Sequence, residues 1–446
     1  AGLVGSEMCI RDSGNQEFAQ PSRAGIAPAA SGAGACRPRL YCLTPSWSRV
    51  AVRYPLMFNF TALPPLSLYI HIPWCVRKCP YCDFNSHEAR NGIPEAAYIE
   101  ALMADLEQDL PSVWGRTVET VFFGGGTPSL FSPDGIDRLL AGVRARIPLK
   151  PDAEITLEAN PGTVDHTHFK GFREAGINRL SIGIQSFQPG LLKEIGRIHS
   201  DVEAIAAVVA AYQAGFDNFN LDLMFGLPGQ THTQALQDLR TAIQLEPAHI
   251  SWYELTIEPN TWFHRHPPQR PDDDTLWEMQ QAGRRLLESS GFERYEVSAY
   301  AGTQRHCRHN MNYWGFGDYL GIGAGAHAKI SDAATQGITR MAKQRHPRSY
   351  MDSAHSAARI SSTSRLEPAD VILEFAMNAL RLEQGFSVAA FNATTGLSYT
   401  DIESIVNRGV AEGLLSHNET IKATQNGQRY LNELLQHWMP DTTAHD

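Results

Sequence analysis

Short apolar runs and amphipathic segments alternate along the chain from Ser67 onwards. Six runs have the length and composition of buried strands; they are Ser67–Pro73, Thr120–Phe123, Glu154–Glu158, Arg179–Ile184, Asn218–Met224 and His249–Thr256. The intervening segments have helical spacing of apolar residues; they are Tyr98–Leu110, Ile136–Ile147, His168–Ala175, a segment ending at Ile195, and Thr233–Leu245. Strands that alternate with helices of this length build parallel βα units. The pattern therefore predicts an α/β fold with an open or complete β/α barrel.

Unusual Gly, Pro and polar residues follow the ends of these predicted strands. A run Gly124-Gly125-Gly126-Thr127 follows the second strand, and Asn160-Pro161-Gly162 follows the third. Gln185 follows the fourth strand. In β/α barrels the functional groups lie at the C-terminal ends of the strands. We therefore expect a functional site at this end of the barrel.

The pattern changes in the last third of the chain. The segment Thr303–Pro347 is rich in Gly, His, Asn and aromatic residues and has no clear period. After Leu366 the pattern predicts short helices, a two-stranded hairpin and a final helix, over Val371–Leu382, Val388–Asn392, Ile402–Glu412, Leu414–Ala423 and Gly427–Trp438. Short helices around one hairpin indicate a winged-helix-like α+β domain. Four basic and eleven acidic side chains after Leu366 would repel phosphate, which favours a packing or protein-contact role over DNA binding.

These changes predict a division into a barrel over residues 57–300, a connecting segment over 301–365 and the winged-helix-like domain over 366–439. The first 56 residues differ from the rest, because no Asp, Glu or Lys occurs from Phe18 to Leu56. Such a leader is typical of an organelle transit peptide. The alternative is translated upstream sequence, since Ala1–Ser13 resembles read-through of a sequencing adaptor. Met57 is then a natural start.

Composition and charge exclude several classes of protein. Hydrophobic residues make up 43% of the 446 residues and charged residues 19%, enough apolar material for a large core. The net charge of −10 argues against sequence-independent nucleic-acid binding. No apolar run approaches the ~18 residues of a membrane-spanning helix. Seven cysteines, three of them within eight residues, do not resemble a disulfide framework and indicate a reduced, cytoplasmic protein with one metal site.

Three cysteines follow the first predicted strand directly. Cys75, Cys79 and Cys82 have the spacing C-x3-C-x2-C. Three thiolates this close can bind three corners of a cubane iron–sulfur cluster and leave the fourth iron open to a small bidentate molecule. A structural zinc site needs four ligands. Because His71 or His87 could supply the fourth, zinc is the alternative.

This cysteine spacing after the first barrel strand resembles the radical S-adenosylmethionine (radical SAM) superfamily. The surrounding segments resemble HemW-type haem chaperones, which are related to oxygen-independent coproporphyrinogen III oxidase; among them are SLYIHIPWC, FFGGGTPSL, FNLDLMFGLPGQT and HNMNYWGFGDYLGIGAGAH. The resemblance covers Met57 to about Met439. It implies a radical SAM partial (β/α)6 TIM-like barrel, one [4Fe–4S] cluster on the three cysteines, and S-adenosylmethionine as cofactor.

The same resemblance implies which residues contact S-adenosylmethionine, and it assigns no catalytic residue. The matching positions are Tyr69, Tyr81, Gly124, Gly125, Gly126, Thr127, Glu158, Gln185, Arg197 and Asp222. Plainer interpretations remain for several of them. The glycine run could be an ordinary tight turn, and Glu158 could cap a helix. Asp222 lies within an apolar strand, where a carboxylate needs a partner.

The motif HNxxYW is the haem-associated signature of the chaperone family. Its members here are His309, Tyr313 and Trp314. An imidazole can serve as an axial ligand of haem iron, and the two rings offer a packing surface. The alternatives are a core histidine, or ligation by His306 or Cys307. Four basic side chains could pair with the haem propionates or form a solvated face; they are Arg340, Lys343, Arg345 and Arg348.

The resemblance therefore implies a chaperone that binds haem and passes it to haem-requiring respiratory proteins, including membrane-associated recipients. It also implies an electron donor and a homodimer, and no nucleic-acid partner. The alternative function is that of an oxygen-independent coproporphyrinogen III oxidase or dehydrogenase in porphyrin biosynthesis. That enzyme has a fourth cysteine two residues after the triplet, where this chain has Phe84. A third possibility, a winged-helix regulator with a vestigial cluster, is disfavoured by the acidic C-terminal region.

Overall fold

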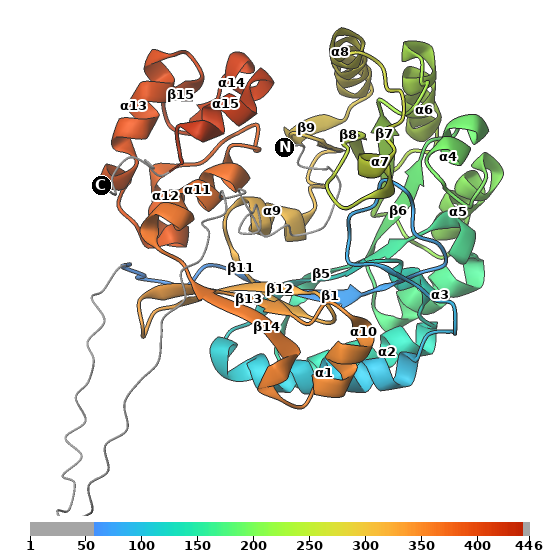
Figure 1. Cartoon of the computed structure of the whole chain (residues 1–446), viewed down its shortest axis with the longest axis horizontal. Helices are drawn as coiled ribbons and strands as arrows, with labels where there is room; N and C mark the ends of the chain where they lie inside the picture. The colour runs from blue at the N-terminus through green and yellow to red at the C-terminus, as the bar shows by residue number, and fades with distance from the viewer. Residues whose placement is uncertain (1–57, 440–446) are drawn as a thin grey trace, which may run out of the picture.

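A single large sheet organises the described part of the chain. The computed structural model describes residues 58–439, so the predicted leader over 1–56 lies outside the described residues. Twelve strands lie in the order β14-β13-β12-β11-β1-β4-β5-β6-β7-β8-β10-β9 (Figure 1). The six predicted strands are confirmed as consecutive parallel neighbours. They are β1 (Leu66–Ile72), β4 (Val118–Gly125), β5 (Leu149–Ala159), β6 (Arg179–Gln185), β7 (Phe219–Phe225) and β8 (His249–Glu254).

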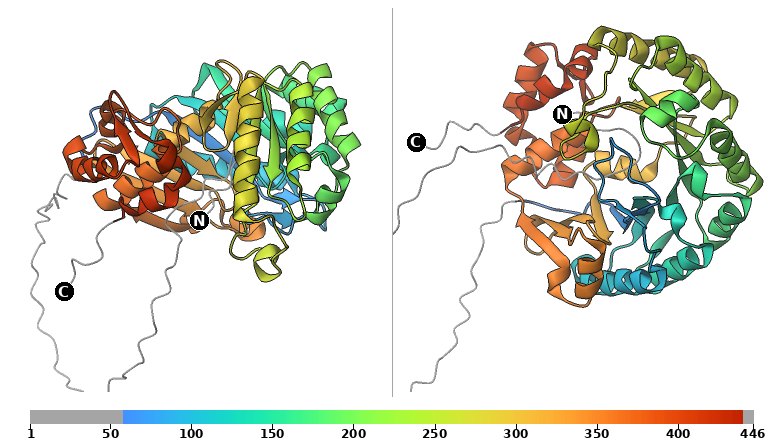
Figure 2. Two further views of the ribbon diagram at one scale, coloured as in Figure 1. Left: turned by 90° about the horizontal axis from the view of Figure 1, so that it is seen from above. Right: turned by 45° about the vertical axis from the view of Figure 1, so that its right-hand side comes forward.

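Helices cover the outside of the parallel strands in an arc (Figure 2). They are α1 (Glu95–Asp109), α2 (Pro133–Arg144), α3 (His166–Ala175), α4 (Pro189–Glu194), α5 (Asp201–Gln213), α6 (His232–Gln244) and α8 (Asp273–Ser289). The short helix α7 (Trp262–Arg265) lies instead against the loop after β1, where the N–H of Phe263 donates to Pro80 O at 3.0 Å. Helix α2 shows how the outer helices pack, with Ile136, Leu139 and Val143 buried on one side. The sequence pattern did not reveal α5, because exposed apolar residues such as Val202 and Val209 blur its amphipathic period. It did not reveal α8 either.

The segment without a clear sequence period supplies strands that extend the sheet. Strand β11 (Asp318–Ile322) pairs in parallel with β1. Beyond it, β12, β13 and β14 continue in antiparallel pairs, over His327–Asp332, Gly337–Lys343 and Ile360–Arg365. At the other edge β8 is followed by β10 (Ala299–Ala301) and β9 (Glu293–Glu296), also antiparallel. The described barrel is therefore open, with β14 and β9 at its edges.

Two further helices belong to this region. Helix α9 (Arg308–Trp314) contacts β1, β4 and β11 on the inside of the barrel. Helix α10 (Pro347–Ser353) packs on α1 at the outside. Short 3-10 helices occupy connections at Leu110–Val113, Pro128–Leu130, Pro161–Thr163, Ala357–Arg359 and Tyr399–Asp401. The predicted domain boundaries at residues 300 and 365 stay predictions.

The C-terminal region has a hydrophobic core of its own and lies beside the barrel (Figures 1 and 2). Its elements are α11 (Pro368–Ala379), α12 (Val388–Thr395), α13 (Glu403–Ala411), β15 (Leu415–His417), β16 (Ile421–Ala423), α14 (Gln425–Arg429) and α15 (Leu431–Gln436). Phe58, Phe60 and Phe316 pack into the same core. The observed order of helices and hairpin agrees with the predicted elements, except that the single final helix predicted over Gly427–Trp438 is divided into α14 and α15. The winged-helix designation stays a prediction.

A buried group of charges joins the strand extension to the barrel. Lys343 on β13 is 0% exposed and contacts both Asp105 and Asp109 of α1, with 2.6 Å between its Nζ and Asp105 Oδ1. Arg359 pairs with the same two carboxylates. Arg340 is also buried and pairs with Glu374 of α11. The suggestion that Arg340 and Lys343 neutralise haem propionates or form a solvated face is therefore wrong, since both lie in internal ion pairs.

Lys343 offers a direct test of this buried group. Removing its ammonium in Lys343→Met would leave two buried carboxylates that share one cation, Arg359. Breaking such a group costs about 3–5 kcal/mol. We expect a loss of that size in the free energy of unfolding, measured by urea denaturation. The control Lys170→Met removes an exposed ion pair, in which Lys170 Nζ lies 3.9 Å from Glu174 Oε1. This substitution should lower the free energy of unfolding by less than about 0.5 kcal/mol. Equal effects of the two substitutions would contradict this account.

Candidate functional site

The three predicted cluster cysteines lie on a loop that packs against the end of β4. This cysteine loop, residues 73–90, contains two short parallel strands, β2 (Trp74–Cys75) and β3 (His87–Glu88). The backbone N–H of Gly126 donates to Ile72 O at 2.8 Å, and that of Thr127 donates to Trp74 O at 2.8 Å. The glycine turn after β4 therefore holds the loop through its main chain.

Two positions of this turn require glycine because neighbouring atoms lie too close for a Cβ. A Cβ on Gly126 would lie 2.5 Å from the carbonyl oxygen of Trp74. Gly125 has φ +122°, a conformation that favours glycine, and a Cβ there would lie 2.6 Å from the ring of His71. A side chain at Gly126 would therefore push the cysteine loop away from the barrel, and one at Gly125 would displace the ring of His71.

Each cysteine of the loop is partly buried beside a polar group. Thr127 Oγ1 donates to Cys75 Sγ at 3.5 Å, and Arg197 Nη1 to Cys79 Sγ at 3.9 Å. Cys82 Sγ lies 3.8 Å from Ser86 Oγ. Burial, with the neighbouring cysteines, raises the pKa of Cys82 to about 11. A metal must therefore displace the proton when it binds this thiol.

The donor set suits a cluster better than a single ion. Within residues 58–439, no three His, Cys, Asp or Glu side chains converge as one metal ion requires. Both ring nitrogens of His71 are engaged, Nδ1 with the Tyr69 hydroxyl at 3.0 Å and Nε2 with Asn85 O at 2.9 Å. His71 is therefore not available as a fourth zinc ligand. A cubane spreads its thiolates over three separate irons, which matches three donors without a shared centre.

Several predicted cofactor contacts surround the cysteine loop. One small cavity is lined by Cys79, Thr127 and Arg197. Glu158, at the end of β5, accepts from the backbone N–H of Gly125 at 3.2 Å, so it supports the glycine turn. Gln185, at the end of β6, has φ +70° and accepts from the Tyr253 hydroxyl at 2.7 Å. A non-glycine residue in this conformation is strained, and such strain is common at functional sites.

Arg197 is the central cation of this group. Its Nη2 donates to Gly183 O at 2.5 Å. Burial opposes its charge, but Tyr81 and Cys79 outweigh that effect and hold its pKa above the usual value. Tyr81 itself packs on an apolar cluster that includes Tyr253.

Tyr69 and Asp222 lie farther along their strands from this end of the barrel. Tyr69 packs on Phe122 with 6.3 Å between ring centroids. Asp222 accepts from Ser181 Oγ at 2.9 Å and from Asn220 Nδ2 at 3.0 Å. The carboxylate therefore has the partners that its burial requires. Sequence reasoning missed Tyr253 and Asn85; the latter stands in the segment CDFNSH, within the cysteine loop.

The predicted haem residues lie in a different part of the barrel. His309 is 5% exposed, with its Nδ1 2.8 Å from Thr120 Oγ1 and its ring 5.0 Å from that of Phe122. Thr120 and Gly125 are five residues apart on β4, or about 16 Å along the strand. Tyr313 and Trp314 pack edge to face at 5.2 Å. The structure therefore does not bring this group together with the cysteine loop.

Comparisons with known proteins agree with these features. Residues 69–242 match the radical SAM superfamily, and residues 366–430 match the HemN C-terminal domain. The chain is 49% identical to "Heme chaperone HemW" of Escherichia coli (strain K12), over 84% of this chain and 98% of the relative. It is 48% identical to the protein of that name from Haemophilus influenzae, with the same coverage. It is 37% identical to "Radical S-adenosyl methionine domain-containing protein 1, mitochondrial" of Bos taurus, over 69% of this chain and 72% of the relative.

Among solved structures, the coproporphyrinogen III oxidase (HemN) from Escherichia coli has a similar fold. The TM-score is 0.72 at 23% sequence identity, with 87% of this chain and 91% of that chain covered. At this identity the likeness shows the fold alone. In the described part of the chain, no helix combines the length and the apolar character needed to cross a membrane.

Through His71, the stability of the fold around this site depends on pH. Burial lowers the pKa of His71 to about 4, so the ring is neutral in the folded protein at pH 7. In the unfolded chain the ring takes up a proton near pH 6.5. The contribution of the neutral His71 ring to the free energy of unfolding is therefore complete above pH 6.5. It is lost as the pH drops towards 4, by up to about 3 kcal/mol.

In His71→Asn we expect lower stability at pH 7 but a shallower loss between pH 6.5 and 4, because one fewer proton is taken up on unfolding. Urea denaturation over this pH range measures both effects. The control His166→Ala removes an exposed ring and should leave the slope unchanged. A slope equal to that of the wild type in His71→Asn would show that the buried ring does not control acid stability.

Proposed function

The chain belongs to the HemW family of radical SAM proteins, and on this premise we propose that it binds haem and delivers it to haem-requiring proteins. The observation that carries the proposal is 49% identity across 98% of the Escherichia coli heme chaperone. The match is not confined to the barrel, since the C-terminal region also fits its own family. Haem is therefore the proposed cargo rather than a product.

Membership of the radical SAM superfamily implies an iron–sulfur cluster and S-adenosylmethionine. We propose that Cys75, Cys79 and Cys82 hold a [4Fe–4S] cluster, which supplies one-electron chemistry to S-adenosylmethionine when both are bound. The thiols lie on a loop that the glycine turn fixes, and Arg197 offsets part of their charge. This arrangement fits three anionic ligands.

The proposed S-adenosylmethionine contacts are main-chain and polar groups near the cysteine loop, together with two tyrosine rings. The glycine turn holds the cysteine loop next to these contacts, because the space beside Gly125 and Gly126 is filled by His71 and by the carbonyl of Trp74. Glu158 already accepts from this turn and could also accept from a cationic methionyl amine. Polar groups come from Gln185 on β6, from Asp222 on β7, and from Arg197 in the segment between α4 and α5. Tyr69 and Tyr81 add rings.

The alternative function, oxygen-independent coproporphyrinogen III oxidation, has weaker support. The shared fold with the oxidase comes at only 23% identity. At the position of the oxidase's additional cysteine this chain has Phe84. The side chain of Phe84 can neither bind a metal nor donate a proton. The backbone of Phe84 instead accepts from Lys78 Nζ at 3.0 Å and closes the loop.

The proposal extends to partners and location. The recipients are haem-requiring respiratory proteins, some of them membrane-associated, and an electron donor reduces the cluster. The protein acts in the cytoplasm and can form a homodimer. Haem contact through the HNxxYW residues His309, Tyr313 and Trp314 is part of this proposal.

Iron content tests the cluster. After anaerobic reconstitution we expect about four irons per chain in the wild type. Cys79→Ser should lose most of this iron, because two remaining thiolates do not hold a cubane. Cys307→Ser is the matched control, since Cys307 is buried outside the loop. This variant should retain its iron. Equal iron in both variants, or stoichiometric zinc in the wild type, would contradict the assignment.

Product and transfer assays separate carrier from oxidase. We expect the haem-loaded protein to raise the haem content of an apo-form haem protein, measured by the acceptor's Soret absorption after separation. With coproporphyrinogen III, S-adenosylmethionine and a reductant, we expect no protoporphyrinogen. Formation of protoporphyrinogen without any haem transfer would favour the oxidase instead.

A further inference from the structure

Helix α9, which carries the HNxxYW residues, lies between the barrel and the C-terminal region (Figure 1). In its first turn the backbone N–H of His309 donates to Glu154 of β5 at 3.0 Å. At its other end Phe316, two residues after α9, belongs to the hydrophobic core of the C-terminal region, with its ring centroid 5.9 Å from that of Phe375. A helix of seven residues is not stable alone, so these two anchors decide where its side chains lie.

Trp314, the last residue of α9, is covered by a cation that follows α11. The guanidinium carbon of Arg381 lies 4.5 Å from the centroid of the Trp314 ring. Nη2 of Arg381 donates to Glu296 Oε2 of β9 at 2.9 Å, and the side chains of this ion pair are 2% and 4% exposed. Nε of Arg381 has no hydrogen-bond acceptor among the described residues, so the indole face serves as the second partner of the guanidinium.

The carboxylate that holds Arg381 is itself fixed by the main chain. Glu296 Oε1 accepts from the backbone N–H and the hydroxyl of Ser298, at 3.1 and 2.9 Å. The backbone of Leu382, the residue after Arg381, forms an antiparallel bridge with Glu296. The position of the guanidinium is therefore set by backbone and carboxylate together, and the guanidinium in turn sets the ring of Trp314.

Tyr313 is connected to the C-terminal region by a second series of contacts. Its ring centroid lies 5.2 Å from that of Trp314 and 5.3 Å from that of Tyr319. The guanidinium of Arg340 lies over Tyr319, 5.8 Å from the ring centroid, and pairs with Glu374 of α11. Both rings of the motif therefore belong to series of contacts that reach the C-terminal region.

We propose that Arg381 is a positioning residue for haem, which holds the ring of Trp314 and so makes haem affinity depend on the C-terminal region. The inference rests on the proposed function, because it takes haem as the cargo and the HNxxYW residues as its contacts. Trp314 is only partly buried, so its own surroundings in the barrel do not enclose the ring. A flat macrocycle binds a ring that is already oriented with a smaller loss of entropy. Arg381 itself needs no contact with haem.

Titration of the reconstituted full-length protein with ferric haem tests this role. Arg381→Met removes the cation, and Glu296→Gln in the same chain removes the buried charge that would otherwise lose its partner. In this double variant we expect about fivefold weaker haem binding, the worth of one desolvated cation–π contact, with an unchanged Soret maximum. Arg381→Lys keeps a cation for Trp314 and Glu296, and should restore the affinity to within about twofold of the wild type.

Two further measurements separate positioning of the ring from a general effect on the fold. Arg294→Met is the matched control, because Arg294 of β9 pairs with Glu383, two residues after Arg381, and no contact joins it to Trp314 among the described residues. It disturbs the same junction, and haem affinity should stay within about twofold of the wild type. In a Trp314→Ala background, removal of the Arg381–Glu296 pair should weaken haem binding no further, because Arg381 acts through the ring.

The outcomes separate the inference from the proposed function. Wild-type affinity in the Arg381→Met and Glu296→Gln double variant would overturn the role of Arg381 while leaving a haem carrier intact. An equal loss of affinity in Arg294→Met, or an undiminished loss in the Trp314→Ala background, would overturn it in favour of a general effect on the junction. Failure of the wild-type protein itself to bind haem would overturn the proposed function and the inference together.

Discussion

The parallel register of β1 and β4 is the constraint on which the rest of the site depends. It pairs Ile72 with Gly125, so the cysteine loop and the glycine turn leave the sheet side by side. Main-chain hydrogen bonds then hold the loop, and these bonds are possible only because Gly126 has no Cβ. The neighbouring parallel strands bring Glu158 and Gln185 to the same end of the barrel, where three thiols, one guanidinium and a polar rim form a single site.

The sequence predicted the six barrel strands and the cysteine loop because apolar period and residue spacing are local properties. It missed α5, whose exposed Val202 and Val209 hide its amphipathic period. It also missed β11 to β14, of which β11 joins the sheet through β1, a strand about 250 residues earlier in the chain. It also assigned Lys343 to a surface or a ligand, whereas the carboxylates that bury it lie more than 200 residues away. A local sequence pattern does not show which distant residues a charged side chain will pair with. The role of Asn85 was missed for the same reason, because its amide bonds the carbonyls of Ala324 and Arg345.

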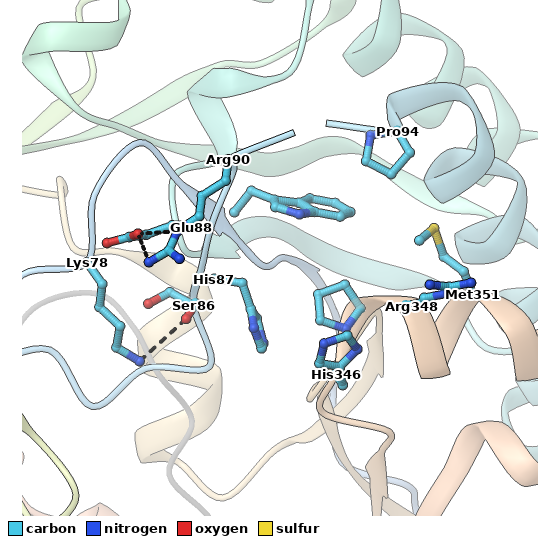
Figure 3. Close-up of a pocket in the computed structure, with 11 residues that line it drawn as sticks. Lys78, Ser86, His87, Glu88, Arg90, Pro94, His346, Arg348 and Met351 are labelled. Carbon is cyan, nitrogen blue, oxygen red and sulfur yellow. Dashed lines mark hydrogen bonds and ion pairs between the residues drawn. The ribbon is translucent and has the colours of Figure 1, made fainter. Parts of the chain in front are cut away.

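The cysteine loop has two different surroundings. Its inner side faces the barrel and the predicted S-adenosylmethionine contacts, while its outer side, with Lys78 and His87, lines a shallow groove (Figure 3). Lys78 lies between Cys75 and Cys79 and closes the loop through backbone carbonyls. The three thiols and this outer surface therefore belong to one short segment of the chain.

We infer that three thiolates of this loop hold a cluster with one iron open to S-adenosylmethionine. Electron paramagnetic resonance of the reduced, reconstituted protein tests it most directly, with spectra recorded before and after addition of S-adenosylmethionine. We expect the signal of a reduced [4Fe–4S] cluster whose g-values shift when the cofactor binds the open iron. A cluster signal that does not respond to S-adenosylmethionine, or the absence of any cluster signal, would contradict it.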